Sequence, residues 1–305
     1  MLDSHGLHLR AAFFRCIRSF FYQQGFLEVD TPLRQPVYLP ESNIVPLASE
    51  QLYLQTSPEL CMKRLLAAGN SKIMQICPCF RKEERGRLHQ EEFQMLEWYR
   101  TGADYHQLML DCEELLRFLM KSLLQQRPGG GAGQQFFSGV TLAARWQRMT
   151  VAEAFSRYSP IPLQQALKED RFDEILVECI EPHLGNGAPV FLYDYPVELG
   201  SLARKCRDNP AVVERFELYL HGVELANGFS ELTDAEEQRA RFVDEIATIK
   251  GSTGREVTMP ERFLTDLRHL DTAAGIAMGL DRLFMIAMNR QHISEAVTFS
   301  SEDFL

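Results

Sequence analysis

The chain has 305 residues, and its 32 Lys+Arg against 42 Asp+Glu give a formal charge of −10. A hydrophobic fraction of 45% with 24% charged residues is typical of a globular protein and excludes a disordered or collagen-like chain. The acidic balance argues against nucleic-acid binding through bulk charge, and no apolar stretch approaches the ~20 residues of a membrane helix. The first residues have no signal-peptide pattern, and the seven scattered cysteines suit reduced thiols, so we expect a cytoplasmic protein with no membrane partner.

The N-terminal part of the chain predicts a long helix followed by several strands. Apolar side chains at helical spacing predict a helix over residues 8–24, which Gly25 ends. Strands are predicted at 25–32, Leu52–Leu54, Ile73–Cys77 and Glu92–Tyr99, with a helix at Ser57–Ala68. Alternation in the last of these strands predicts that Phe93, Met95, Glu97 and Tyr99 share one face.

The C-terminal part begins with a second long helix. Asp104 and Gln107 resemble a capping box, and leucines on one side predict a helix that ends at Pro128. We expect a flexible glycine-rich linker at 127–139 and a small helical insertion at about 140–188. Strands are predicted again at Pro189–Tyr195 and Arg215–Ala226. Because regular β-α-β alternation is absent, this order favours an α+β fold around an antiparallel sheet, in a single domain over 1–305.

The first segment that could carry chemistry is Phe80–His89 with Glu92–Tyr99. It predicts a hairpin with Arg81 at its root, and an arginine there suits a phosphate because its guanidinium donates two parallel charge-assisted hydrogen bonds. Four basic residues face four acidic ones between 81 and 92, so a solvated charged hairpin is the alternative.

The second segment is Arg215–Glu231. If His221-Gly222 is a two-residue turn, Glu217 lies on the face of Tyr219, diagonal to Glu224. With no Lys or Arg expected beside them, two such carboxylates would repel. A divalent cation that bridges them to phosphate is one interpretation, and exposure of both to water is the other.

The third segment is Gly275–Met285. Small residues at 275, 277 and 279 allow a ligand close to the backbone, and a helix follows at once. Arg282 would lie in the first turn of that helix, beside free N–H groups and the positive end of the helix dipole. A tight crossing of two elements explains this pattern equally well when it stands alone.

In this order and at these spacings the three segments resemble motifs of the class II aminoacyl-tRNA synthetases. Motif 1 would be Arg10–Pro32, motif 2 Phe80–Tyr99 and motif 3 Gly275–Met285. Thr56-Ser57-Pro58-Glu59 and Glu224–Glu231 make the sequence most similar to lysyl-tRNA synthetases. The resemblance implies the class II catalytic core, an antiparallel sheet flanked by helices, over nearly the whole chain. Motif 1 builds the dimer interface in this class, so we expect a homodimer through the Phe-rich helix 8–24.

Fewer than ten residues precede the motif 1 helix, which predicts that an anticodon-binding domain is absent. The chain therefore resembles the free-standing lysyl-tRNA synthetase paralogues. These activate (R)-β-lysine with ATP and transfer it to a lysine side chain of translation elongation factor P; tRNA is not an expected partner. The alternatives are activation of L-α-lysine for tRNA or a small acceptor, and a non-catalytic regulator. An asparagine synthetase-like amide ligase is disfavoured by Glu97 and Glu231.

The resemblance also implies roles for individual residues. Arg81 and Arg282 are the expected catalytic residues, with Arg81 between the substrate carboxylate and the α-phosphate and Arg282 at the γ-phosphate. The expected ATP contacts are Arg81, Lys82, Glu83, His89, Gln90, Phe93, Glu224, Leu225, Gly279 and Arg282, and the expected Mg2+ ligands are Glu217 and Glu224. The expected substrate contacts are Ser57, Pro58, Glu59, Glu97, Tyr99, Asn227, Glu231 and Ala277. Of these, Glu59 binds the backbone-type amine, Asn227 the carboxylate, and Glu97, Tyr99 and Glu231 the side-chain ammonium.

Two positions depart from the pattern of lysyl-tRNA synthetases. Ala277 stands where that family usually has a glycine in motif 3. One extra methyl beside the amino-acid pocket could select a substrate whose amino group is displaced by one carbon, at ~1–3 kcal/mol. An alanine that merely replaces a glycine of negative φ is the alternative. Gln90 lies in Gln90-Glu91-Glu92, where the family more often has Asn-Pro-Glu, so its contact with adenine stays open.

Overall fold

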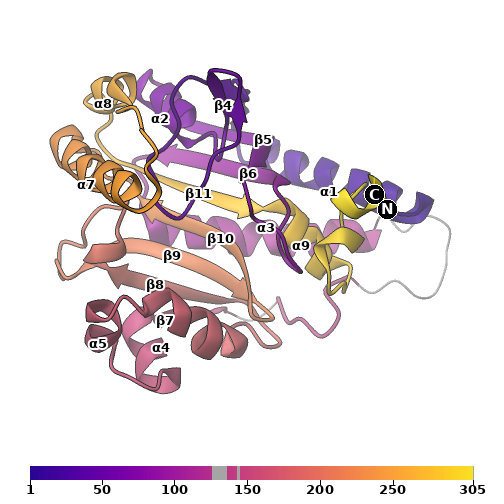
Figure 1. Cartoon of the computed structure of the whole chain (residues 1–305). Helices are drawn as coiled ribbons and strands as arrows, with labels where there is room; N and C mark the ends of the chain where they lie inside the picture. Colours follow the sequence, from indigo (N-terminus) through magenta and orange to yellow (C-terminus); the bar gives the residue numbers. More distant parts are fainter. Residues whose placement is uncertain (126–135, 143–144, 305) are drawn as a thin grey trace.

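The computed structural model of the chain describes residues 1–125, 136–142 and 145–304. An eight-stranded sheet runs through it in the order β1-β5-β6-β11-β10-β9-β8-β7 (Figure 1). Only the outermost pairs, β1 with β5 and β7 with β8, are parallel; the inner pairs are antiparallel. The predicted α+β fold around an antiparallel sheet is therefore confirmed.

The elements have the following bounds. The main sheet consists of β1 (Leu27–Glu28), β5 (Lys72–Phe80), β6 (Glu92–Thr101), β11 (Ala273–Gly279), β10 (Val223–Ser230), β9 (Val212–Leu220), β8 (Val190–Pro196) and β7 (Gln147–Thr150). A small sheet consists of β2 (Arg34–Gln35), β4 (Leu52–Leu54) and β3 (Ala48–Ser49). The α-helices are α1 (Ser4–Gln23), α2 (Glu59–Ala67), α3 (Tyr105–Gln125), α4 (Val151–Tyr158), α5 (Leu163–Lys168), α6 (Phe172–Ile175), α7 (Ala235–Thr253), α8 (Glu261–Leu267) and α9 (Leu280–Ala287).

The helix α1 packs against α3 along one face of the main sheet (Figure 1). Asp3 caps α1 by accepting a hydrogen bond from the N–H of Gly6 at 2.7 Å, so the helix begins before the predicted residue 8. Its side chains Phe13, Ile17 and Phe21 are fully buried in the core of this chain. This aromatic face is therefore part of the core of the chain itself, and a second subunit would have to contact other side chains of the helix; the expected homodimer stays a prediction.

Several predicted elements differ in length from the observed ones. The strand expected at 25–32 is only the two-residue β1, whereas β5 extends to Phe80. The insertion at about 140–188 was expected to be helical, yet it contains β7, a four-residue strand too short to show alternation. Most of the predicted linker at 127–139 lies outside the described residues. The helices α7 and α8 were not predicted.

The candidate motifs come together because β11 lies between two hairpins. β5 and β6 form the first hairpin, and β9 and β10 form the second, with the predicted turn at His221-Gly222, where both residues have positive φ. The register places Ala277 of β11 opposite Glu97 of β6 on one side and Asn227 of β10 on the other. The central strand of this region therefore carries the small side chains, and its neighbours carry the polar ones.

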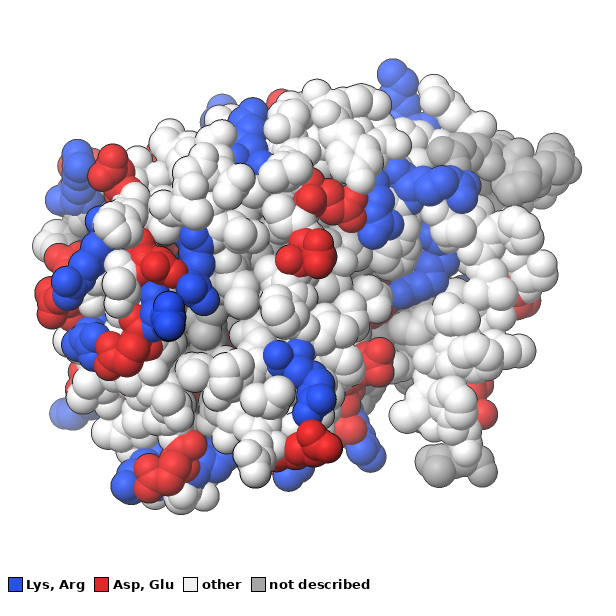
Figure 2. All heavy atoms as spheres, turned by 90° about the horizontal axis from the view of Figure 1, so that it is seen from above, with Lys and Arg blue, Asp and Glu red and all other residues white. Residues whose placement is uncertain are grey.

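Basic and acidic side chains lie interspersed on the face that Figure 2 shows, apart from the grey residues. This mixed pattern agrees with the expectation that bulk charge does not hold nucleic acid. Within the described part of the chain, no helix is both long enough and apolar enough to cross a membrane.

Candidate active site

A cavity of about 600 Å³ is lined by residues of β6, β9, β10 and β11 and by loop residues at 41–44 and 198–202. It brings together side chains from all three candidate segments. The expected site residues in its lining are Ser57, Glu59, Arg81, His89, Gln90, Phe93, Glu97, Tyr99, Glu217, Glu224, Leu225, Asn227, Ala277, Gly279 and Arg282.

Four of the expected residues do not line the cavity. Lys82 and Glu83 have side chains that are 51% and 73% exposed and pair with each other at 3.3 Å. Glu84, the next residue, lines the cavity in their place. Pro58 lies directly before α2, and Glu231 is buried beside Gly275 of β11.

The first cationic group of the cavity is Arg282, in the first turn of α9 as predicted. Its Nη1 donates to the carbonyl of Glu224 at 3.0 Å, its Nε to the carbonyl of Leu88 at 3.2 Å, and its Nη2 lies 2.5 Å from Nε2 of His89. Burial and the Arg282 charge lower the pKa of His89, which favours a neutral imidazole that accepts this hydrogen bond. The guanidinium is thus fixed before any ligand arrives, by contacts with β10 and with the loop between β5 and β6.

Arg81 is the second cationic group, directly after β5. Its backbone N–H donates a hydrogen bond to the carbonyl of Glu91 at 2.9 Å, which extends the pairing of the β5–β6 hairpin. Its guanidinium lies 5.3 Å from the centre of the Phe93 ring. The side-chain Nε is buried and has no hydrogen-bond partner among the described residues. A buried cationic donor that has no partner and lies in a cavity wall can bind an anionic ligand.

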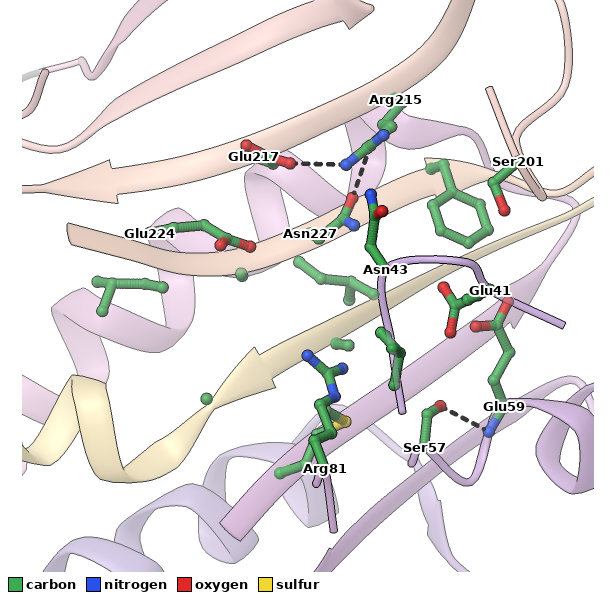
Figure 3. Close-up of a pocket in the computed structure, with 18 of the residues that line it drawn as sticks. Glu41, Asn43, Ser57, Glu59, Arg81, Ser201, Arg215, Glu217, Glu224 and Asn227 are labelled. Atoms are coloured by element: carbon green, nitrogen blue, oxygen red, sulfur yellow. Dashed lines mark hydrogen bonds and ion pairs between the residues drawn. The ribbon is translucent and has the colours of Figure 1, made fainter. Parts of the chain in front are cut away.

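Glu217 and Glu224 lie near each other, but the surroundings of Glu217 differ from the prediction. Its carboxylate accepts hydrogen bonds from Tyr195 at 2.5 Å and Tyr219 at 2.7 Å. It also accepts one from Arg215 at 2.7 Å (Figure 3). The expectation that no Lys or Arg lies on this face is wrong, because Arg215 is two residues away on the same strand and therefore points to the same side. Burial and the neighbouring Glu224 charge raise the pKa of Glu217.

No three His, Cys, Asp or Glu side chains of the described residues gather into a metal cage. Mg2+ does not require one, since it is often held by one or two carboxylates together with substrate phosphates. The Glu224 side chain is 37% exposed and fits this role, whereas the Glu217 oxygens already accept three hydrogen bonds.

The other end of the cavity is acidic and buried. Glu97 accepts hydrogen bonds from Ser57 at 2.6 Å and from Tyr99 at 2.7 Å, and Ser57 also accepts from the backbone N–H of Glu59 at 3.0 Å. Burial raises the pKa of Glu97 and of Glu231, each to about 8, and the Glu59 charge adds to both shifts. A positively charged ligand would stabilise the ionised form of these buried carboxylates.

The patterns in the sequence missed two charged residues of this end. Lys63, on α2, is buried and forms ion pairs with Glu59 and Glu231. Its i,i+4 spacing from Glu59 was a signal that could have revealed it. Glu41 comes from an irregular loop, and its carboxylate faces Glu59 (Figure 3); burial and the Glu59 charge raise its pKa to about 7. No periodic pattern predicts a loop residue of this kind.

Two positions of β11 shape the floor of the cavity. A Cβ at Gly275 would lie 2.2 Å from the Tyr99 ring and 2.5 Å from Oε1 of Glu231, so only glycine leaves room for both. Ala277 lies between Glu97 and Asn227, the expected contacts for the ammonium and for the carboxylate. Its methyl therefore occupies the middle of the expected amino-acid pocket.

Residues 4–303 match the family model described as tRNA synthetases class II (D, K and N). The chain belongs to the class II tRNA synthetase family. This assignment agrees with the large antiparallel sheet and with the three candidate segments around one cavity.

Several curated class II relatives are similar along almost their whole length. Elongation factor P–(R)-β-lysine ligase of Pseudoalteromonas translucida is 35% identical, covering 96% of this chain and 94% of that protein. The proteins of the same name from Edwardsiella ictaluri and Pectobacterium carotovorum are 36% and 37% identical, covering 95% and 96% of this chain and 93% and 94% of theirs. The resemblance to the lysyl-tRNA synthetase paralogues is thereby confirmed.

Proposed function

We propose that this class II synthetase-like chain is a ligase that activates (R)-β-lysine with ATP and transfers it to a lysine side chain of elongation factor P. The observation that carries the proposal is one cavity that is lined by Arg81 and Arg282 at one end and by Glu59 and the buried Glu97 at the other. The buried Glu231 lies next to this acidic end, beside Gly275. A diamino acid fits this polarity, with its carboxylate towards the arginines. The names of the relatives point to the same substrate and acceptor.

In the first half-reaction the substrate carboxylate attacks the α-phosphorus of ATP, and pyrophosphate leaves. A carboxylate is already nucleophilic at neutral pH, so catalysis consists of positioning and charge stabilisation. Arg81 would bind both the carboxylate and the α-phosphate through its unpartnered N–H, and Arg282 would neutralise the γ-phosphate. Phe93 would stack against the adenine, next to His89.

Mg2+ would supply charge neutralisation at the phosphates when bound. Glu224 is the residue best placed to hold it, with Glu217 behind it in the cavity wall. Three hydrogen bonds keep the Glu217 carboxylate fixed. Glu217 would therefore act indirectly, by orienting the side chains next to Glu224.

In the second half-reaction a lysine amine of the acceptor protein attacks the adenylate carbonyl. An amide bond forms, the acyl–phosphate bond breaks, and AMP leaves with the electron pair on its phosphate oxygen. The amine loses a proton, for which solvent or the phosphate oxygen is sufficient. We expect a cytoplasmic homodimer, whose interface would use other parts of the first helix region, such as the exposed Leu7, Tyr22 and Leu27.

Amino-acid-dependent ATP–pyrophosphate exchange tests the proposal, with (R)-β-lysine and L-lysine compared under one set of conditions. Faster exchange with (R)-β-lysine, followed by ATP-dependent mass addition to elongation factor P, is the expected result. Exchange with L-lysine alone would favour the lysyl-transfer alternative. Exchange with neither would contradict the adenylate chemistry and favour a regulator.

A further inference from the structure

A lysine lies buried beside the acidic end of the cavity. The Lys63 side chain is 2% exposed, and its Nζ lies 2.5 Å from Oε2 of Glu231 and pairs also with Oε1 of Glu59. The same Nζ lies 5.0 Å from the centre of the Phe229 ring, which covers it from another side. Lys63 thus joins two of the three carboxylates that the proposed function assigns to the substrate.

The charges of this cluster are incomplete without a ligand. Glu59, Glu97 and Glu231 bear three negative charges when ionised, and Lys63 bears one positive charge. Buried charges are stable only when they are paired, so two further positive charges are needed. A substrate with two ammonium groups supplies them, while its carboxylate is bound at Arg81 outside the cluster.

Glu231 provides independent evidence that a donor is missing. The residue is 1% exposed, and its Oε1 has no hydrogen-bond partner among the described residues. This oxygen faces Gly275, where a Cβ would lie only 2.5 Å from it. A buried carboxylate oxygen without a hydrogen-bond donor would be stabilised by a donor that the ligand supplies.

We propose that Lys63 is a positioning residue that holds Glu59 and Glu231 in place and favours the ionised form of Glu231, so that a substrate with two ammonium groups completes the pocket. This inference rests on the proposed function. Besides Glu97, the titratable groups that face the cluster are Tyr99 and Glu41, and neither adds positive charge. Burial raises the pKa of Glu231, and Lys63 is the group that lowers it. Burial works against the charge of Lys63, yet Glu231 and Glu59 raise its pKa above the ordinary value.

The test is pyrophosphate exchange between about pH 6 and about pH 9 with Lys63→Met and Lys63→Arg. Without Lys63 the carboxyl of Glu231 holds its proton to higher pH, so Lys63→Met should raise KM for the diamino acid roughly 100-fold near pH 7. The acid limb of kcat/KM should move up by about one pH unit or more, with the KM for ATP unchanged. Lys63→Arg, which keeps the charge, should restore the pH profile. Lys72→Met is the control, because Lys72 lies over Phe26 and bonds to the carbonyl of Gln24.

A role that is only structural would lower the melting temperature of Lys63→Met without moving the pH profile, and this result would overturn the inference. If Lys63→Met does not fold, the Lys63 ammonium resonance of the wild type decides, with Lys63→Arg as the assignment control. A shift of that resonance on addition of the diamino acid supports the inference, and an unmoved resonance contradicts it. Loss of exchange in the wild type would instead refute the proposed function itself.

Discussion

Gly275→Ala is the sharpest test of the pocket geometry. The new methyl would lie 2.2 Å and 2.3 Å from two carbons of the Tyr99 ring, about 1.2 Å inside ordinary contact. Tyr99 is 3% exposed and donates its hydroxyl to Glu97, so the ring cannot turn aside without losing that bond. Overpacking costs about 1–3 kcal/mol and a lost hydrogen bond about 1 kcal/mol.

We therefore expect a loss of about 2–4 kcal/mol in the free energy of unfolding, measured with denaturant. The KM for the amino acid should rise at least about tenfold, because Glu97, Tyr99 and Glu231 all shift. Gly279→Ala is the matched control on the same strand, since its methyl would lie 3.8–3.9 Å from the Arg282 side chain. Its unfolding free energy should change by less than about 0.5 kcal/mol. Equal destabilisation of both variants, or an unchanged amino-acid KM in Gly275→Ala, would refute the reasoning.

Three further predictions concern pH, selectivity and turnover. The folded protein holds protons on Glu97 and Glu231 to about pH 8, against an ordinary pKa of 4.5, so the ligand-free protein should lose unfolding free energy as pH rises from 4.5 to 8. Denaturant titrations across this range check it, and the slope should become less steep in Glu97→Gln; a flat profile in the wild type would contradict it. Ala277→Gly should shift the ratio of kcat/KM values towards L-lysine by about tenfold in pyrophosphate exchange, and an unchanged ratio would exclude selection by this methyl. Arg282→Ala should abolish exchange while Arg290→Ala, at an exposed position, retains it; activity in the former would remove Arg282 from catalysis.

Local sequence patterns were sufficient for the elements that carry the motifs. Alternation placed Phe93, Glu97 and Tyr99 on one face, and a two-residue turn fixed the pairing of Tyr219 with Glu224. These features depend on neighbours within a few residues, so the chain reveals them directly. The short strand β7 and the loop that carries Glu41 lack any such period, and the sequence alone could not predict their place.

The sequence by itself determined the family, the α+β class and the residue types of the cavity, because motif spacing and side-chain chemistry are local properties. Only the tertiary structure decided which charged groups pair across the fold and which side chains are buried. It joined Lys63 to the distant Glu231 and buried the aromatic face of α1 inside its own core. Each of these outcomes depends on burial and on contacts between distant segments, which set pKa values and exposed area but leave no period in the sequence.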